Sequence, residues 1–162
     1  MLKNKQAGNL EAVPTLMSRK ISKLNYENDY DFLLYGLICA HKDYKLCHEL
    51  NAALQLDFHR KADVVVPAGK PGSSTSHSYF TCNDNDGELF HVITNRDMDG
   101  TGFFIPEMRS IDFFLILYDV AGVYDTVNLI KQVREIEIVS GAFEMDPSEL
   151  KSAEAFLLFL EG

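Results

Sequence analysis

The sequence lacks a long apolar run and contains few cysteines. Its longest unbroken apolar stretch is nine residues, 32–40, whereas a membrane-spanning helix needs about 20. The N-terminal lysines are not followed by an apolar segment, so we expect neither a membrane span nor a secretory signal. The three cysteines, Cys39, Cys47 and Cys82, are odd in number and far apart. This usage is typical of reduced thiols in a cytoplasmic protein rather than of a secreted disulfide scaffold.

Basic side chains are also scarce. The 162 residues include 15 Lys and Arg against 24 Asp and Glu, so the formal net charge is -9. This balance excludes a generally basic nucleic-acid-binding domain and argues against charge-driven docking on anionic lipid. Residues 1–25 nevertheless carry a net charge of +4. We expect 1–20 to be a flexible extension with a natural start near Met17, and 21–162 to form a single α+β domain.

The motifs of common catalytic and cofactor sites are missing. The chain has no Gly-x-Ser-x-Gly, no Cys-x-x-Cys and no His-Glu-x-x-His, and Gly69-Lys70 is followed by Pro71 rather than by Ser or Thr. Cys82 and His91 face each other across an expected hairpin, but nothing else supports a nucleophile and base there. We therefore predict no catalytic, cofactor-binding or metal-binding residue, and the sequence favours a protein that is not an enzyme.

One loop resembles half of a calcium site. Asn95, Asp97, Asp99 and Gly100 match the first half of a calcium loop, but Pro106 stands where the bidentate glutamate belongs. We interpret the stretch as a turn, in which Asn, Asp and Gly are favoured for backbone reasons.

Hydrophobic periodicity divides the chain into strands and helices. Stretches that are apolar on alternating or on all positions predict strands at 30–40, 63–67, 78–82, 88–94, 111–118 and 136–144. Helical spacing predicts helices over 42–55 and 122–135, the second burying Val123, Val127, Ile130 and Val133. Asp146-Pro147-Ser148-Glu149 is a strong helix start, while 156–160 is compatible with helix or strand.

This order of elements predicts the class of fold. It favours an α+β fold with a mainly antiparallel sheet and helices packed on one face, in a split β-α-β arrangement of the ferredoxin-like or ACT-like kind. Pro67 places the strand at 63–67 on a sheet edge, because proline cannot donate to a ladder.

The most distinctive segment is Ile105-Pro106-Glu107-Met108-Arg109-Ser110-Ile111-Asp112-Phe113. Pro106 ends an extended stretch, Glu107 and Arg109 can pair with nearby groups, and Asp112 opens a buried strand. The segment resembles the signature of the IPExxVDY family of small bacterial proteins, as do 30–32 with 42–47 and 143–147 with 150–152. Ile111 and Phe113 depart from the family's Val and Tyr. The resemblance implies a compact single domain and carries over no catalytic residue.

Three functions remain open at this stage. The first is a non-catalytic module that self-associates as a homodimer or binds a protein partner, with candidate residues Ile105, Pro106, Glu107, Arg109, Asp112 and Phe113. The second is an ACT-like domain that binds a small molecule at the turns 40–43 or 119–125. The third is an acid–base enzyme that uses Glu107 and Asp112.

Overall fold

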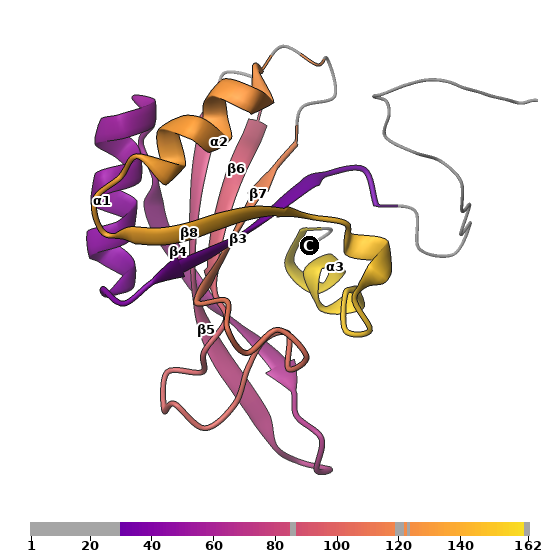
Figure 1. Cartoon of the computed structure of the whole chain (residues 1–162). Helices are drawn as coiled ribbons and strands as arrows, with labels where there is room; N and C mark the ends of the chain where they lie inside the picture. Colours follow the sequence, from indigo (N-terminus) through magenta and orange to yellow (C-terminus); the bar gives the residue numbers. More distant parts are fainter. Residues whose placement is uncertain (1–29, 85–86, 119–121, 123, 161–162) are drawn as a thin grey trace, which may run out of the picture.

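The computed structural model describes residues 30–84, 87–118, 122 and 124–160, and the expected N-terminal extension lies outside these ranges. The described residues form a six-stranded sheet in the order β4-β5-β6-β7-β3-β8 (Figure 1). Each strand is antiparallel to its neighbours. The strands are β3 (Leu33–Cys39), β4 (His59–Pro67), β5 (Ser74–Asp84), β6 (Gly87–Thr94), β7 (Phe113–Leu117) and β8 (Val139–Met145).

Helices complete the α+β fold that the sequence predicts. They are α1 (Asp43–Leu54), α2 (Thr126–Arg134), a short 3₁₀ turn η1 (Pro147–Glu149) and α3 (Glu154–Leu160). No helix among these is long and apolar enough to cross a membrane.

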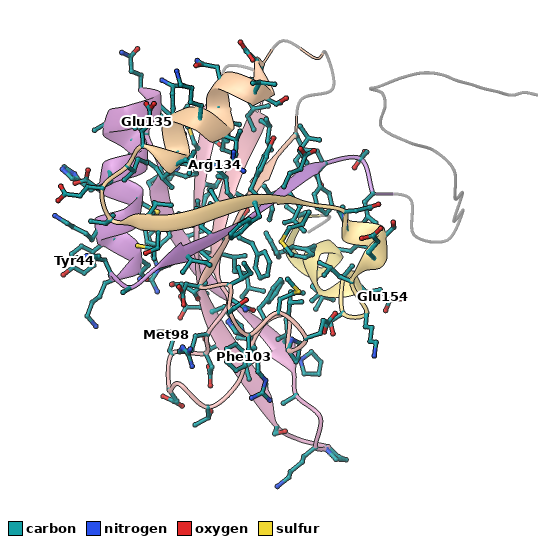
Figure 2. The ribbon with its side chains drawn as sticks, viewed as in Figure 1. Tyr44, Met98, Phe103, Arg134, Glu135 and Glu154 are labelled. Atoms are coloured by element: carbon teal, nitrogen blue, oxygen red, sulfur yellow. The ribbon has the colours of Figure 1, made fainter. Side chains whose placement is uncertain are left out.

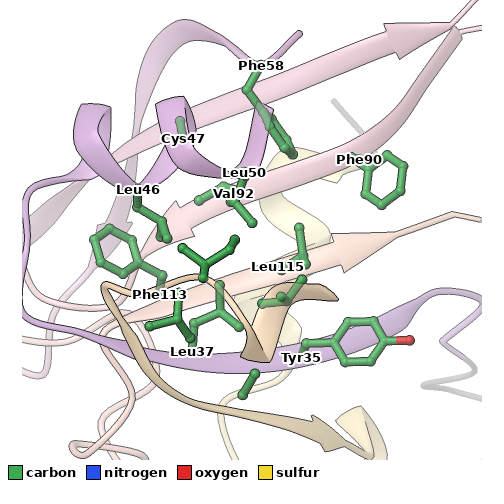
Figure 3. Packing of buried hydrophobic residues seen from close by; sticks show 14 of the residues in the cluster. Tyr35, Leu37, Leu46, Cys47, Leu50, Phe58, Phe90, Val92, Phe113 and Leu115 are labelled. Carbon is green, nitrogen blue, oxygen red and sulfur yellow. The ribbon is translucent and has the colours of Figure 1, made fainter. Parts of the chain in front are cut away.

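The helices α1 and α2 cover one face of the sheet. Leu46, Cys47 and Leu50 of α1 pack against strand residues such as Val92 and Leu115, all of them almost completely buried (Figure 3). We call this the α1–α2 face. Its side chains alternate along each strand with those that point to the opposite side, as the twofold period of a strand requires.

The helix α3 covers the opposite face, so the expectation that the helices lie on one face is wrong. Phe156 of α3 is fully buried against Phe104 and Phe114, with ring centroids 5.1 and 5.3 Å away. The reason lies in the strands themselves. Leu34 and Ile116 are fully buried on this side, and strands that are apolar on both faces need cover on both. We call this the α3 face.

The buried face of α2 agrees with the expected one at Val133 and, in part, at Ile130, and it differs from the expected one at Val127. Leu129 and Val133 are buried, whereas Val127 is 77% exposed. Val123, the fourth residue of the expected stripe, lies outside the described residues. The helix begins later than its apolar pattern suggests, because the Asp125 carboxylate accepts a hydrogen bond from the Asn128 amide and so caps the first turn.

The other elements follow the sequence pattern with shifted ends. β4 lies on a sheet edge as Pro67 predicts, but it begins four residues earlier than expected. Asp146 caps a helix start by accepting from the Ser148 amide at 3.0 Å, yet that helix is the single turn η1, because Leu150 returns to an extended conformation. The ambiguous stretch 156–160 is helical, as the end of α3.

Candidate functional site

The segment 105–113 lies between the loop after β6 and the start of β7. Ile105 is fully buried, Pro106 and Arg109 are exposed, and Phe113 is buried as the first residue of β7. The family-like motif therefore alternates between core and surface. Its interior part contributes to the packing of the sheet, and its exposed residues are Pro106, Glu107, Arg109 and Ser110.

Asn95, which the sequence places in a calcium-like turn, holds this segment in position. Its side-chain amide donates to the carbonyls of Met108 and Ile111 and accepts from the amide of Ile105, each at 2.8 Å. Its backbone bonds Phe104 and Asp112. Because this fully buried side chain makes its hydrogen bonds to backbone groups of the segment 105–113, it holds that segment in place much as the backbone hydrogen bonds of a sheet hold a strand.

Glu107 joins the motif to the residues before α3. Its two carboxylate oxygens accept from the amide and the hydroxyl of Ser152, at 2.7 and 2.9 Å. Partial burial raises the pKa of Glu107. The hydrogen bonds from Ser152 and from neighbouring backbone amides together lower it by more than burial raises it, so the pKa lies below its ordinary value. The carboxylate is thus an ionised acceptor near the start of α3.

Asp112 serves a different element. Its Oδ2 accepts from the amide of Cys39 at 2.9 Å, and its backbone amide donates to the carbonyl of Leu37. Glu107 and Asp112 are therefore each engaged with a different backbone donor, and neither lines the two pockets described below. This geometry provides no shared cleft for the acid–base reaction considered from the sequence.

Arg109 lies against an aromatic ring rather than against an acid. Its guanidinium carbon is 5.3 Å from the centroid of the Phe103 ring, and that of Arg96 is 4.9 Å from the same centroid. Figure 2 shows Phe103 beside the loop that carries Met98, below the centre of the sheet. Both cations gain from the ring, since cation–π contacts stabilise at such distances, and they order the exposed side of the motif.

The calcium-like turn binds its own chain. Asp97 accepts from the Ser76 amide at 2.8 Å and from the Thr101 hydroxyl at 3.1 Å. The bond from Ser76 is the largest influence and, with Thr101, it holds the pKa of Asp97 below its usual value against a smaller effect of burial. Among the described residues, no group of three or more His, Cys, Asp or Glu side chains is placed to hold a metal ion.

The cysteines are buried and unbonded to one another. Burial raises the pKa of Cys39, and it raises the pKa of Cys47 to about 12 with a further contribution from Asp43. Cys82 and His91 point to opposite faces, because Cys82 belongs to the α1–α2 face while His91 shares a 2.7 Å hydrogen bond with Tyr79 on the α3 face. The cysteine–histidine pair considered from the sequence is thus not formed.

Two pockets lie beside α2. The larger, of about 430 Å³, is a shallow groove between α1 and the end of α2, lined by Glu49, Ala52, Ala53, Gln132, Glu135, Ile136 and Glu137. The smaller, of about 130 Å³, is lined by residues that include Leu56, Phe90, Tyr124 and Asp125. It touches the second of the turns suggested from the sequence for a small ligand, while residues 119–121 of that turn lie outside the described part.

The sheet has two edges, and they differ in how they are protected. β4 carries exposed Arg60 and Lys61, changes register between Lys61 and Val64, and ends at Pro67. Charges, bulges and proline are the features by which natural edge strands avoid pairing with other chains. β8 (Val-Ser-Gly-Ala-Phe-Glu-Met) has neither lysine nor proline, and its Phe143 is 47% exposed.

The backbone of β8 presents hydrogen-bonding groups to this open edge. The Leu37 carbonyl of β3 accepts from Asp112 on the β7 side. In an antiparallel ladder both polar groups of a residue point to one side. Leu37 therefore does not bond β8, and its partner Ala142 directs its N–H and C=O away from the sheet. By alternation Glu144 does the same. The edge is thus a short template for a further strand.

Comparison with protein-family models, with curated proteins and with solved structures found no match for this chain.

Proposed function

We propose that the protein is a non-catalytic interaction module that self-associates through the open edge of β8. The observation that carries the proposal is the contrast between the two edges of one sheet. β4 is guarded by two exposed cations, a register shift and Pro67. β8 has neither lysine nor proline, and beyond the register shift at Ser140 near its start it directs the polar groups of Ala142 and Glu144 outward.

Apolar surface next to the β8 edge supports the same function. Phe143 lies on the α3 face, and its ring lies over Gly141, where an added Cβ would come within 3.0 Å of it. Ile38 and Met145 beside it are partly buried. Strand addition supplies main-chain hydrogen bonds, while adjacent side chains supply affinity through burial. An exposed phenylalanine at an open edge meets both needs.

The functional residues of this proposal are not those of the family-like motif. Ile105, Asp112 and Phe113 support the sheet from within, while Glu107 is bonded to Ser152. The motif thus contributes to the interaction by holding β7 and β3 in register beneath β8, and the contact surface itself lies on the last strand.

Light scattering coupled to gel filtration tests the proposal. At micromolar concentration the protein should elute with a mass of twice 18.3 kDa. Phe143→Lys should return it to the monomer, because a lysine at an edge opposes pairing. Val65→Lys is the matched control: Val65 is 59% exposed on the opposite edge strand, and its substitution should leave the dimer intact. A strict monomer for the unmodified protein at all concentrations refutes the proposal.

A second candidate function, an ACT-like small-molecule sensor, draws support from the strand order. The strands β8-β3-β7-β6 with α1 and α2 form two crossovers, each passing over one intervening antiparallel strand, and the β4–β5 hairpin is inserted in the first. This order agrees with what a ferredoxin-like split β-α-β fold with an insertion would have, and it supports the second candidate on that ground. The 130 Å³ pocket beside Tyr124 and Asp125 is the site in which such a ligand would bind.

A thermal-shift screen of amino acids, nucleotides and divalent cations tests this second function. Saturating a site must raise the melting temperature, because a ligand that binds only the folded state stabilises it. An increase that Asp125→Asn abolishes would support the sensor, with Asp146→Asn, which caps η1 instead, as the control. An unchanged melting temperature throughout the panel would contradict it.

A further inference from the structure

The open edge of β8 carries one side chain that occupies a backbone acceptor. Nε of Arg134, the last residue of α2, donates to the outward carbonyl of Ala142 at 2.9 Å. Figure 2 shows Arg134 between α2 and the β8 ribbon. Arg134 therefore places a positive charge next to position 142 at the place where a further strand would pair.

We propose that two copies of the chain pair antiparallel through β8 about a twofold axis at Phe143, with Arg134 of each copy next to Glu144 of the other. The inference rests on the self-association proposed above and adds its register and its charge contacts. In this register Ala142 of one copy lies opposite Glu144 of the other, so both outward-facing residues find hydrogen-bonding partners. The Ala142 carbonyl has two lone pairs, so it can accept from the Glu144 amide of the second copy as well as from Arg134.

Hydrogen bonding restricts the possible registers. A residue whose backbone N–H and C=O point away from β3, such as Ala142 or Glu144, must lie opposite a residue of the second copy with the same orientation. The twofold axis of the dimer therefore passes through position 141, 142, 143 or 144. The registers centred on 141 and 142 pair Ser140 with a residue of the second copy. The ladder between β3 and β8 skips Ser140, because Ile38 pairs with Gly141 and Cys39 with Val139. A bulged residue disrupts regular pairing, which disfavours both of these registers.

Charge distinguishes the two remaining registers, centred on 143 and 144, and gives a second argument against the register centred on 142. An axis at position 144 places Glu144 directly opposite its own copy, and an axis at 142 brings the two Arg134 side chains together. Like charges directly opposite each other destabilise a pair of strands. The axis at Phe143 alone sets Arg134 against Glu144 in both halves of the dimer, so this register is self-complementary.

The same axis brings apolar surface together on the α3 face. The two Phe143 residues form a pair that is not hydrogen-bonded, in which Cα atoms lie about 4.5 Å apart. Each ring covers Gly141 of its own strand, and Met145 of the second copy lies opposite that glycine. The exposed half of Phe143 is then covered by its own counterpart.

A charge exchange tests the contact between Arg134 and Glu144. Both side chains are exposed, so Arg134→Glu and Glu144→Arg should keep the fold, as circular dichroism checks. Each single variant should weaken the dimer by at least ~10-fold in the sedimentation dissociation constant, because it replaces the opposite charges in each of the two symmetric contacts by a pair of like charges. The double variant should recover to within ~3-fold of the unmodified protein. Single variants that dimerise normally, or a double variant weaker than either, would overturn the proposal.

A disulfide trap tests the register independently. Phe143→Cys should form a covalent dimer under mild oxidation, because the two Cα atoms at the axis lie within bridging distance. Glu144→Cys is the matched control, since its two copies are about 8 Å apart, beyond the roughly 7 Å limit of a disulfide. The native cysteines are buried and do not compete.

The outcomes separate the register from the underlying function. If the unmodified protein is a monomer, the self-association itself fails. If it dimerises and Phe143→Lys disrupts the dimer, but Glu144→Cys cross-links in place of Phe143→Cys, then the function stands and the register proposed here is wrong.

Discussion

Replacing Asn95 with alanine should remove a large part of the stability of the protein. The side chain is fully buried and makes three hydrogen bonds of 2.8 Å, to the backbone of Ile105, Met108 and Ile111. A hydrogen bond contributes about 1 kcal/mol net, and a buried group left without a partner costs about 1–3 kcal/mol. The amide of fully buried Ile105 becomes such a group. We therefore expect the free energy of unfolding to fall by about 4–6 kcal/mol.

Urea unfolding followed by circular dichroism measures this loss. Domains of this size are stable by about 5–15 kcal/mol, so the midpoint should shift strongly while the slope stays unchanged. Asn95→Asp separates the hydrogen bonds from the packing, because it has the same shape and retains only the acceptor for Ile105. It should be at least as destabilising as Asn95→Ala at neutral pH. Asn83→Ala, at an exposed position, is the control and should change stability by less than about 0.5 kcal/mol. A loss below about 1 kcal/mol in Asn95→Ala would refute the reasoning.

Three further measurements test other parts of the structure. Gly36→Ala should lower the free energy of unfolding, measured by urea denaturation, by about 1–3 kcal/mol. The reason is that a Cβ at this position would lie 2.7 Å from Sδ of Met145. Cys47, whose pKa burial raises to about 12, should react with a thiol reagent only after the protein unfolds, so its modification rate should follow denaturant concentration. Burial raises the folded-state pKa of Glu107, but the hydrogen bonds from Ser152 and from neighbouring backbone amides together lower it below its ordinary value. Its carboxylate therefore stabilises the protein above the ordinary pKa and loses this effect as the pH falls through the folded-state pKa. Glu107→Gln should then flatten the dependence of stability on pH below about 4.5, and an unchanged pH profile would contradict this role.

Local patterns predicted the elements of the sheet well, and they failed where distant contacts decide. The apolar stretch at 30–40 became β3, and the hairpin at 78–94 became β5 and β6. The helix predicted at 122–135 buries Leu129 rather than Val127. Its surface has two apolar stripes, and the position of the helix on the sheet determines which of them is buried. Periodicity reports that a helix is amphipathic, but a nine-residue helix does not define its buried face.

Asn95 shows why the polar core of the protein could not be predicted. From the sequence, Asn95, Asp97 and Gly100 indicate a turn, and the structure does contain a turn there, with Gly100 at a φ of 74°. The role of the Asn95 side chain depends on Ile105, 10 residues away, and the role of the Asp97 side chain depends on Ser76, 21 residues away. Residue type alone does not distinguish an amide that holds a buried loop from one that caps an exposed turn, since both uses need the same donor and acceptor.

The proposed interaction edge illustrates the same limit at the level of the whole sheet. Pro67 reveals an edge strand by itself, because a residue without an N–H is tolerated where no neighbour follows. β8 carries no such mark, and its sequence is that of any strand with one buried side. It is an edge only because β3 pairs with β7 on its other side, a contact between residues that are more than 70 positions apart. An edge strand that avoids pairing needs residues such as proline or lysine, which can be seen in the sequence. An edge strand that serves association needs no such residues. The absence of proline and lysine from β8 therefore becomes informative only once the strand order is known.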